Sequence, residues 1–177
     1  NELGKIDEGE EVLKKQISSP SFPITVNAFS AKINFCDFEI GRDFYIDKVK
    51  VKTTSLNHPD GAVGYRVEYN KKSICYITDH EHELKKKNKN LLEFLKNAEV
   101  LIYDSTYDDK HFKNYIGWGH STWQEATRLA KECNIKKLFI FHHNPESDDK
   151  KMGHIEAACR KLNRNFIVAK EGMFVNI

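Results

Sequence analysis

Histidine and aspartate residues follow apolar runs at several separate points of this 177-residue chain. His58 comes just beyond VKTTSL, Asp79 follows SICYIT, and Asp104 ends LIYD. His142 follows LFIF, and His120 lies within the glycine-rich stretch GWGHSTWQ. Neutral imidazole and carboxylate side chains are together the ligands that divalent metals such as zinc bind, at about 2.0–2.2 Å. If these runs are strands whose ends meet, the pattern predicts a site for metal-assisted chemistry.

Each of these residues also has an ordinary structural explanation when it is considered alone. A single histidine after a strand is usually a cap or a turn residue, and the DHEH run at 79–82 is compatible with a solvated loop. Asp79 is the favoured member of that run because it directly follows the apolar residues. In the pair His142–His143 the two side chains point to opposite sides of an extended backbone, so we expect at most one of them to face a given site.

The elements that must position these residues change in character along the chain. A short helix is expected within 7–17, and period-two alternation predicts two antiparallel strands within 31–55 and a hairpin within 65–78. From residue 87 onward, amphipathic patterns alternate with apolar runs. The helices expected there are 90–98, 121–134 (capped by Ser121 or Thr122) and 148–163. The strands expected there are 99–105, 136–143 and a closing pair within 165–177. This order predicts α/β layers rather than an all-β barrel.

Composition sets broad limits on location and partners. The net charge is only +2, so charge alone does not indicate a nucleic-acid-binding protein, and the KKKNKN run at 85–90 is compatible with a solvated loop, a helix start or a contact with a polyanion. The four cysteines form no CxxC pair and are expected to be reduced, mostly buried thiols. No stretch has the roughly 18 apolar residues of a membrane span, and no secretory signal opens the chain. We therefore expect a cytoplasmic protein with no membrane partner.

Five motifs, taken in order, resemble the second half of a metallo-β-lactamase-fold hydrolase. They are LNHPDGAVGYRVEY, SICYITDHEH, LIYDSTY, GWGHSTWQEA and LFIFHHNP. The resemblance covers most of residues 45–177 and is greatest to the branch that includes ribonuclease Z and the cyclic-phosphate phosphodiesterases. It implies the C-terminal part of an αββα sandwich.

The resemblance also implies a role for each candidate residue. His58 corresponds to a ligand of the first metal, Asp79 to the carboxylate that bridges both metals, and His142 to a ligand of the second metal. His120 corresponds to the histidine that approaches the scissile phosphate. The cofactors implied are two divalent metal ions, Zn²⁺ or Mn²⁺, with iron as a further candidate.

Three further residues are expected beside the ligands rather than on the metals. Asp104 is expected to hold His142 or His120 in one tautomer, and His143 is the non-ligand member of its pair. Gln124 stands where phosphodiesterase relatives have an acid, so the sequence does not identify the carboxylate that would orient His120.

The His-x-His-x-Asp-His motif of the family is absent from these 177 residues. We therefore expect one incomplete domain, in which 1–30 is a connecting helix and loop and 31–177 is the second half of the sandwich. The sheet surface left open predicts a homodimer or pairing with the missing N-terminal half.

These observations predict a metal-dependent hydrolase, most simply a phosphodiesterase that uses a water activated by two metals. Its expected substrate is a small phosphodiester, such as a cyclic phosphate, or an RNA end. By itself the chain is expected to be inactive. Two alternatives stay open: a catalytically silent binding or sensor domain of the same fold, and a hydrolase of another ester, a thioester or a lactam.

Overall fold

The computed structural model describes residues 9–177, which divide into two compact units, one ending at Arg42 and the other covering Asp43–Ile177. The regular elements of the first unit are helix α1 (Gly9–Gln16) and the 3-10 helix η1 (Val26–Ala28). Helix α1 agrees with the helix predicted within 7–17, except that residues 7 and 8 lie outside the described part of the chain. The assignment of the whole chain to one domain stays a prediction.

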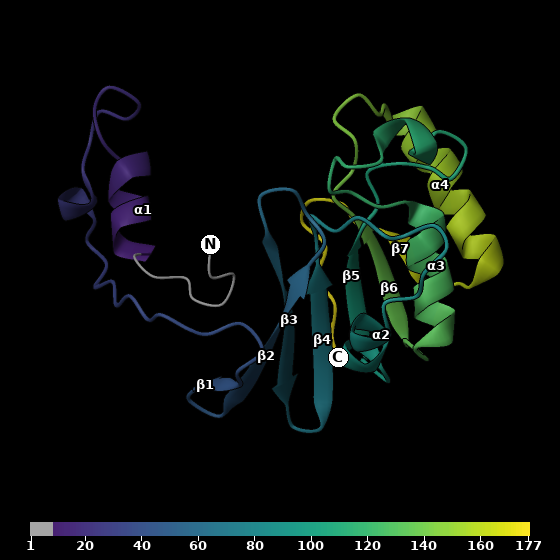
Figure 1. The fold of residues 1–177 in the computed structure, drawn as a ribbon, viewed down its shortest axis with the longest axis horizontal. Helices are drawn as coiled ribbons and strands as arrows, with labels where there is room; N and C mark the ends of the chain where they lie inside the picture. The colour runs from purple at the N-terminus through teal and green to yellow at the C-terminus, as the bar shows by residue number, and fades with distance from the viewer. Residues whose placement is uncertain (1–8) are drawn as a thin grey trace. The chain divides into compact units, whose positions relative to one another are not determined.

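The second unit is built on a seven-stranded sheet whose strands lie in sequence order (Figure 1). Neighbouring strands are antiparallel from β1 to β4 and parallel from β4 to β7. The strands are β1 (Phe44–Ile46), β2 (Val49–Leu56), β3 (Ala62–Tyr69), β4 (Lys72–Ile77), β5 (Val100–Asp104), β6 (Lys137–Phe141) and β7 (Phe166–Val168). The helices are α2 (Lys89–Leu95), the 3-10 helix η2 (Phe112–Tyr115), α3 (Trp123–Glu132) and α4 (Asp149–Leu162). The predicted layered α/β fold is therefore confirmed.

Alternate residues of the parallel strands form the buried core of this unit. Two rows run across the sheet through directly paired positions: Cys75, Leu101, Leu138 and Phe166, and then Ile77, Tyr103, Ile140 and Val168. Every member of these rows is at most 2% exposed. Helices α2, α3 and α4 cover the rows with Leu91, Leu95, Ala126, Ala130 and Cys159. The helices therefore hold the parallel strands rigidly, which fixes where their ends lie.

Local sequence signals explain most turns and helix starts. Asn70 and Lys71 both have positive φ angles, of 47° and 63°, as a two-residue hairpin turn requires, and they join β3 to β4 within the predicted hairpin. Three helices begin at side chains that accept a hydrogen bond from a backbone amide of the first turn: Asn88 for α2, Thr122 for α3 and Asp148 for α4. Of the two caps proposed for α3, Thr122 is the one used.

Two strand predictions are wrong. Residues 32–38 are irregular, because the outer edge of β2 pairs instead with the short strand β1 that immediately precedes it. At the C-terminus only β7 forms, and residues 171–177 contain no strand. A period-two pattern becomes a strand only when a neighbouring strand accepts its backbone hydrogen bonds, and neither segment is a strand of the seven-stranded sheet.

The structure agrees with the expectation of reduced, mostly buried cysteines. Cys75, Cys133 and Cys159 are buried and Cys36 is exposed, and all four are free thiols. Burial raises the pKa of Cys75 to about 11, which keeps it protonated and unreactive at neutral pH. Within residues 9–177, every helix is too short or too polar to cross a membrane.

Two glycines provide a matched test of the packing. A Cβ atom at Gly64 would lie 2.7 Å from Cδ1 of the fully buried Ile77, whereas a Cβ at Gly153 in α4 would meet nothing within 4 Å. We expect Gly64→Ala to lower the free energy of unfolding by about 1–3 kcal/mol through overpacking. Gly153→Ala is expected to raise it by up to about 1 kcal/mol, because alanine favours the helix. Urea unfolding of the two variants measures both effects, and equal destabilisation would contradict this account.

Candidate metal centre

The C-terminal ends of four strands meet at one edge of the sheet. Strands β4, β5 and β6 are parallel, and β2 has the same direction because both β2 and β4 are antiparallel to β3. His58 follows β2, Asp79 follows β4, Asp104 ends β5 and His142 follows β6. Loops at this edge of an α/β sheet commonly carry ligands, because the strands hold them in place. The structure thus places four residues that the sequence pattern indicated at the same end of the sheet: His58, Asp79, Asp104 and His142.

Two of these residues have an unusual backbone. Asp79 and His142 have φ angles of +58° and +57°, in the left-handed region that residues other than glycine rarely occupy. Each of these residues therefore turns the chain sharply after its strand. Its side chain no longer follows the regular alternation of side chains between the two faces of the sheet. Such strain costs of order 1–3 kcal/mol and persists where the surrounding structure enforces it, often at functional sites.

Two groups of three side chains have ligand atoms within 4.8 Å of one another. The first is His58, Asp79 and His120, and the second is Asp104, His120 and His142. Nε2 of His142 lies 3.6 Å from Oδ1 of Asp79, which links the two groups. The rings of His120 and His142 are stacked with centroids 4.9 Å apart. The four strand ends and the GWGHSTWQ loop therefore converge on a single centre.

Asp104 accepts hydrogen bonds from several segments of this centre and so holds them together. Its carboxylate is fully buried and accepts backbone hydrogen bonds from Asp79, Thr106 and Ser121, at 3.0, 3.2 and 3.1 Å. It also accepts a bond from Nδ1 of His120, at 3.0 Å. Burial alone would raise the pKa of the Asp104 carboxyl, but the hydrogen bonds from His120 and Ser121 hold it below its ordinary value. Asp104 is therefore an anion at neutral pH.

The hydrogen bond that His120 donates to Asp104 fixes the tautomer of its imidazole. Because Nδ1–H of His120 donates to the carboxylate, Nε2 is left to face the centre. This hydrogen bond raises the pKa of the His120 imidazole above its ordinary value, against the opposing effect of partial burial. Gln124 takes no part in this pair, since its Oε1 accepts a bond from the backbone of Asp109.

Thr106 is a residue of the centre that the sequence reasoning missed. Its hydroxyl lies 3.1 Å from Nδ1 of His142 and 2.9 Å from Oδ1 of Asp104. If the hydroxyl donates to Asp104, it accepts a hydrogen bond from Nδ1–H of His142, and Nε2 of His142 is then directed at Asp79. The signal was present as the DST sequence, in which the threonine follows the strand-end carboxylate by two residues.

The DHEH run is built into the structure rather than solvated, apart from the half-exposed Asp79. His80 and Glu81 are both buried. Nδ1 of His80 accepts a hydrogen bond from the backbone of Asn57, and burial lowers the pKa of His80 to about 4, so that it is neutral. His143, by contrast, bonds the carbonyl of Ala169 beyond β7 and is not in either ligand group.

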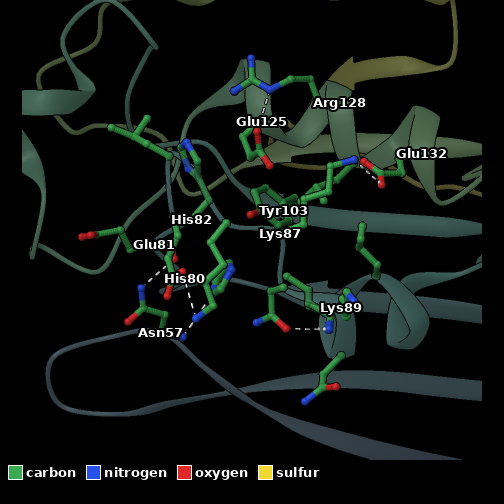
Figure 2. Close-up of a pocket in the computed structure, with 18 of the residues that line it drawn as sticks. Asn57, His80, Glu81, His82, Lys87, Lys89, Tyr103, Glu125, Arg128 and Glu132 are labelled. Carbon is green, nitrogen blue, oxygen red and sulfur yellow. Dashed lines mark hydrogen bonds and ion pairs between the residues drawn. The ribbon is translucent and has the colours of Figure 1, made fainter.

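A cavity of about 1250 Å³ lies beside the DHEH run, and His80, Glu81 and His82 form part of its wall (Figure 2). The wall also contains charged residues of α3 and of the loop that precedes α2, among them Lys87, Arg128 and Glu132. None of His58, Asp79, His120 and His142 lines it. The candidate metal centre is therefore separate from this cavity.

A family model described as a beta-lactamase superfamily domain matches residues 11–143 of the chain. This match covers most of the sequence and includes every residue of both ligand groups. The chain belongs to the metallo-β-lactamase superfamily.

Curated relatives in this superfamily include several enzymes named ribonuclease Z. The chain is 32% identical to that of Archaeoglobus fulgidus over 89 residues, which are 50% of this chain and 29% of the relative. It is 34% identical to that of Thermoplasma acidophilum over 59 residues, which are 33% of this chain and 19% of the relative. The chain thus spans less than a third of the length of these relatives.

Solved structures confirm the metallo-β-lactamase fold. The Bacillus subtilis metallo-β-lactamase fold protein YhfI superposes with a TM-score of 0.64 at 16% identity, over 94% of this chain and 61% of that one. Human tRNase Z, short form, superposes with a TM-score of 0.56 at 22% identity, over 76% of this chain and 44% of that one. At these identities the likeness concerns the fold alone.

The residues of this superfamily member suit divalent cations. The centre combines imidazoles and a carboxylate, and the side chains of Asp79 and His142 are 42% and 34% exposed, so their ligand atoms are accessible. The bond at Nδ1 of His142 leaves Nε2 of that ring available, as a metal-bound histidine requires. The donor set therefore fits metal ions of this fold, and it does not discriminate zinc from manganese or iron.

The role of Asp104 is testable without any metal or substrate. Asp104→Asn replaces one accepting oxygen by an amide that cannot accept, which leaves buried donors without partners. We expect it to lower the free energy of unfolding by about 2–4 kcal/mol. Glu93→Gln, which alters only an exposed ion pair with Lys96, is expected to change it by less than about 0.5 kcal/mol. Urea unfolding measures both, and similar effects would show that Asp104 has no special role.

Proposed function

We propose that this chain contributes the candidate centre of a metal-dependent hydrolase that cleaves phosphodiesters with the help of two divalent cations. The observation that carries the proposal is the pair formed by Asp104 and His120 beside the two ligand groups. A histidine held in one tautomer next to metal ligands suits proton transfer to a leaving group. Membership of the superfamily and the sequence likeness to enzymes named ribonuclease Z support the same reading.

In this proposal His58, Asp79 and His142 would hold the cations, and Oδ1 of Asp79 lies 3.6 Å from Nε2 of His142 in the second group. Bound divalent cations supply Lewis acidity, which lowers the pKa of a water molecule and neutralises charge on phosphoryl oxygens. Asp79 also orients the attacking water, since its carboxylate accepts hydrogen bonds. Thr106 keeps the His142 ring in place.

His120 acts as the proton donor to the leaving oxygen. Its hydrogen bond to the buried Asp104 carboxylate stabilises the imidazolium that carries the proton. Thr122 caps the helix that follows, and Ser121 bonds Asp104 through its amide, so the loop that carries His120 is anchored on its C-terminal side.

The proposed substrate is a small phosphodiester, such as a cyclic phosphate, or an RNA end. The likeness to enzymes named ribonuclease Z favours the RNA end. The net charge of only +2 favours a small ester, because proteins that bind long nucleic acids generally carry a larger excess of basic residues.

A second candidate is a binding or sensor domain with no catalytic activity. It is favoured by the sharing of His120 between the two groups, which leaves few ligands for two cations within the described residues. Metal binding without turnover would support this reading.

The substrate class is tested with a panel of model substrates. A cyclic nucleotide, a linear dinucleotide, a lactam and a thioester are incubated with the complete protein that carries these residues, with added zinc or manganese. We expect turnover of a phosphodiester and none of the lactam or thioester above the rate without protein. Hydrolysis of the lactam or thioester alone would contradict the proposal.

The role of His120 is tested by His120→Ala. We expect a fall in kcat of about 10²–10⁴-fold on a phosphodiester, as for the loss of a general acid. Metal content measured by atomic emission is expected to stay unchanged, whereas His142→Ala is expected to lose bound metal.

The control is His111→Ala, because the side chain of His111 is exposed and, within residues 9–177, its hydrogen bond is with Asp108, three residues earlier. It is expected to keep full activity and metal content. If His120→Ala loses metal as His142→Ala does, His120 is a ligand and not the proton donor.

A further inference from the structure

Glu81 is a buried carboxylate that the proposed chemistry does not use. It lies two residues after Asp79 and is only 9% exposed. Within residues 9–177 no lysine, arginine or histidine forms an ion pair with it. A buried carboxylate without a cationic partner is costly unless hydrogen bonds satisfy it. The donors that satisfy Glu81 therefore indicate its role.

Those donors are backbone amides of the loop that carries His120. One oxygen of Glu81, Oε2, accepts a bond from Gly117 at 2.7 Å and another from Gly119 at 3.0 Å. Both glycines have positive φ angles, of 89° and 84°, which turn their amides toward the same point. Consecutive turns of this kind form a concave anion-binding surface from backbone N–H groups, and here a side chain of the protein occupies it.

The loop held by Glu81 is packed against His58. A Cβ atom at Gly119 would lie 2.8 Å from Nε2 of His58 and 2.8 Å from Cδ of Pro59, so only a glycine allows this approach. His120 is the next residue, and its ring lies 5.8 Å from the ring of His58. Any movement of Gly119 therefore displaces both histidines relative to each other.

The backbone of Glu81 joins a third segment. Its amide donates to the carbonyl of Asn57 at 2.8 Å, and its carbonyl accepts from the side-chain amide of Asn57 at 2.9 Å. Figure 2 shows Asn57, His80 and Glu81 together at the wall of the cavity. Asn57 immediately precedes His58, and Glu81 closely follows Asp79. One residue thus connects the segments that carry His58, Asp79 and His120.

We propose that Glu81 is a positioning residue for the reaction: it holds the Gly117–Gly119 turn so that His120 keeps its place relative to His58 and Asp79. Glu81 acts through the loop and not on substrate or metal. This inference rests on the proposed function for its kinetic consequence, but the structural consequence can be measured independently. What the loop requires is an accepting oxygen at the position of Oε2, and not the negative charge.

The test compares Glu81→Ala with Glu81→Gln. The alanine variant removes the acceptor, whereas the glutamine variant keeps one oxygen that can accept both amides. We expect Glu81→Ala to lower kcat on a phosphodiester by about 10–100-fold, as a displaced catalytic group does, while KM and metal content stay within about twofold. Glu81→Gln is expected to stay within about threefold of the unmodified protein in all three quantities.

Two readouts do not depend on activity. Amide hydrogen exchange at Gly119 is expected to be at least about tenfold faster in Glu81→Ala and unchanged in Glu81→Gln, because exchange requires the hydrogen bond to open. The Nδ1–H resonance of His120 is expected to shift in Glu81→Ala. Glu132→Ala is the matched control: its carboxylate lines the same cavity but bonds only Lys87, so it should alter none of these quantities.

Each outcome decides the proposal. Unchanged exchange at Gly119 in Glu81→Ala, or loss of metal in that variant, would overturn it. If the alanine variant does not fold, Glu81→Asp replaces it, since its carboxylate is withdrawn by about 1.5 Å and should give a smaller change in the same direction. If the unmodified protein cleaves no phosphodiester, the proposed function fails, and the exchange and resonance measurements still decide whether Glu81 positions the loop.

Discussion

The centre depends on one buried anion, the carboxylate of Asp104. It lies at the end of a core strand and accepts hydrogen bonds from the segments that carry Asp79 and His120. The Thr106 hydroxyl contacts both Asp104 and Nδ1 of His142, and so connects the two side chains. A buried charge that is not hydrogen-bonded would cost several kcal/mol, so these donors must stay in place for the fold to be stable. The geometry of the candidate centre is therefore coupled to the stability of the unit, and loosening one disturbs the other.

The parallel half of the sheet makes this coupling possible. Two buried rows of side chains and the helices over them hold β4, β5 and β6 side by side, so the ends of these strands are fixed before any ligand binds. The last step is then local: the left-handed turns at Asp79 and His142 direct two half-exposed side chains toward each other. A tightly packed core holds the strands, and strained backbone at Asp79 and His142 fixes the two side chains. Preorganisation of a site requires both.

Sequence patterns predicted the parts of this molecule that depend on local physics. Alternating strands and helices, a hairpin between β3 and β4 and a helix cap at Ser121 or Thr122 all follow from side-chain period and turn chemistry. Period-two alternation also predicted a strand at residues 32–38, which are irregular. The prediction was wrong because alternation does not reveal whether a neighbouring strand exists. Thr106 and Glu81 were missed since their roles consist of contacts with residues 36 positions away in the chain. The fold was needed to show which ring and which backbone amides these two side chains meet.

Asp79 and Asp104 show how environment separates two carboxylates of one centre. Both have oxygen atoms near the histidines, and distance alone makes either a candidate metal ligand. Asp104, however, is fully buried, and its oxygens are already occupied by donors from Asp79, Thr106, His120 and Ser121. A carboxylate offers about four lone pairs, so few remain for a cation. Asp79 is 42% exposed, and its carboxylate is the one accessible from solvent. Hydrogen-bond saturation thus favours Asp79 over Asp104 as the metal ligand of the proposed function, and it favours Asp104 as the residue that orients His120.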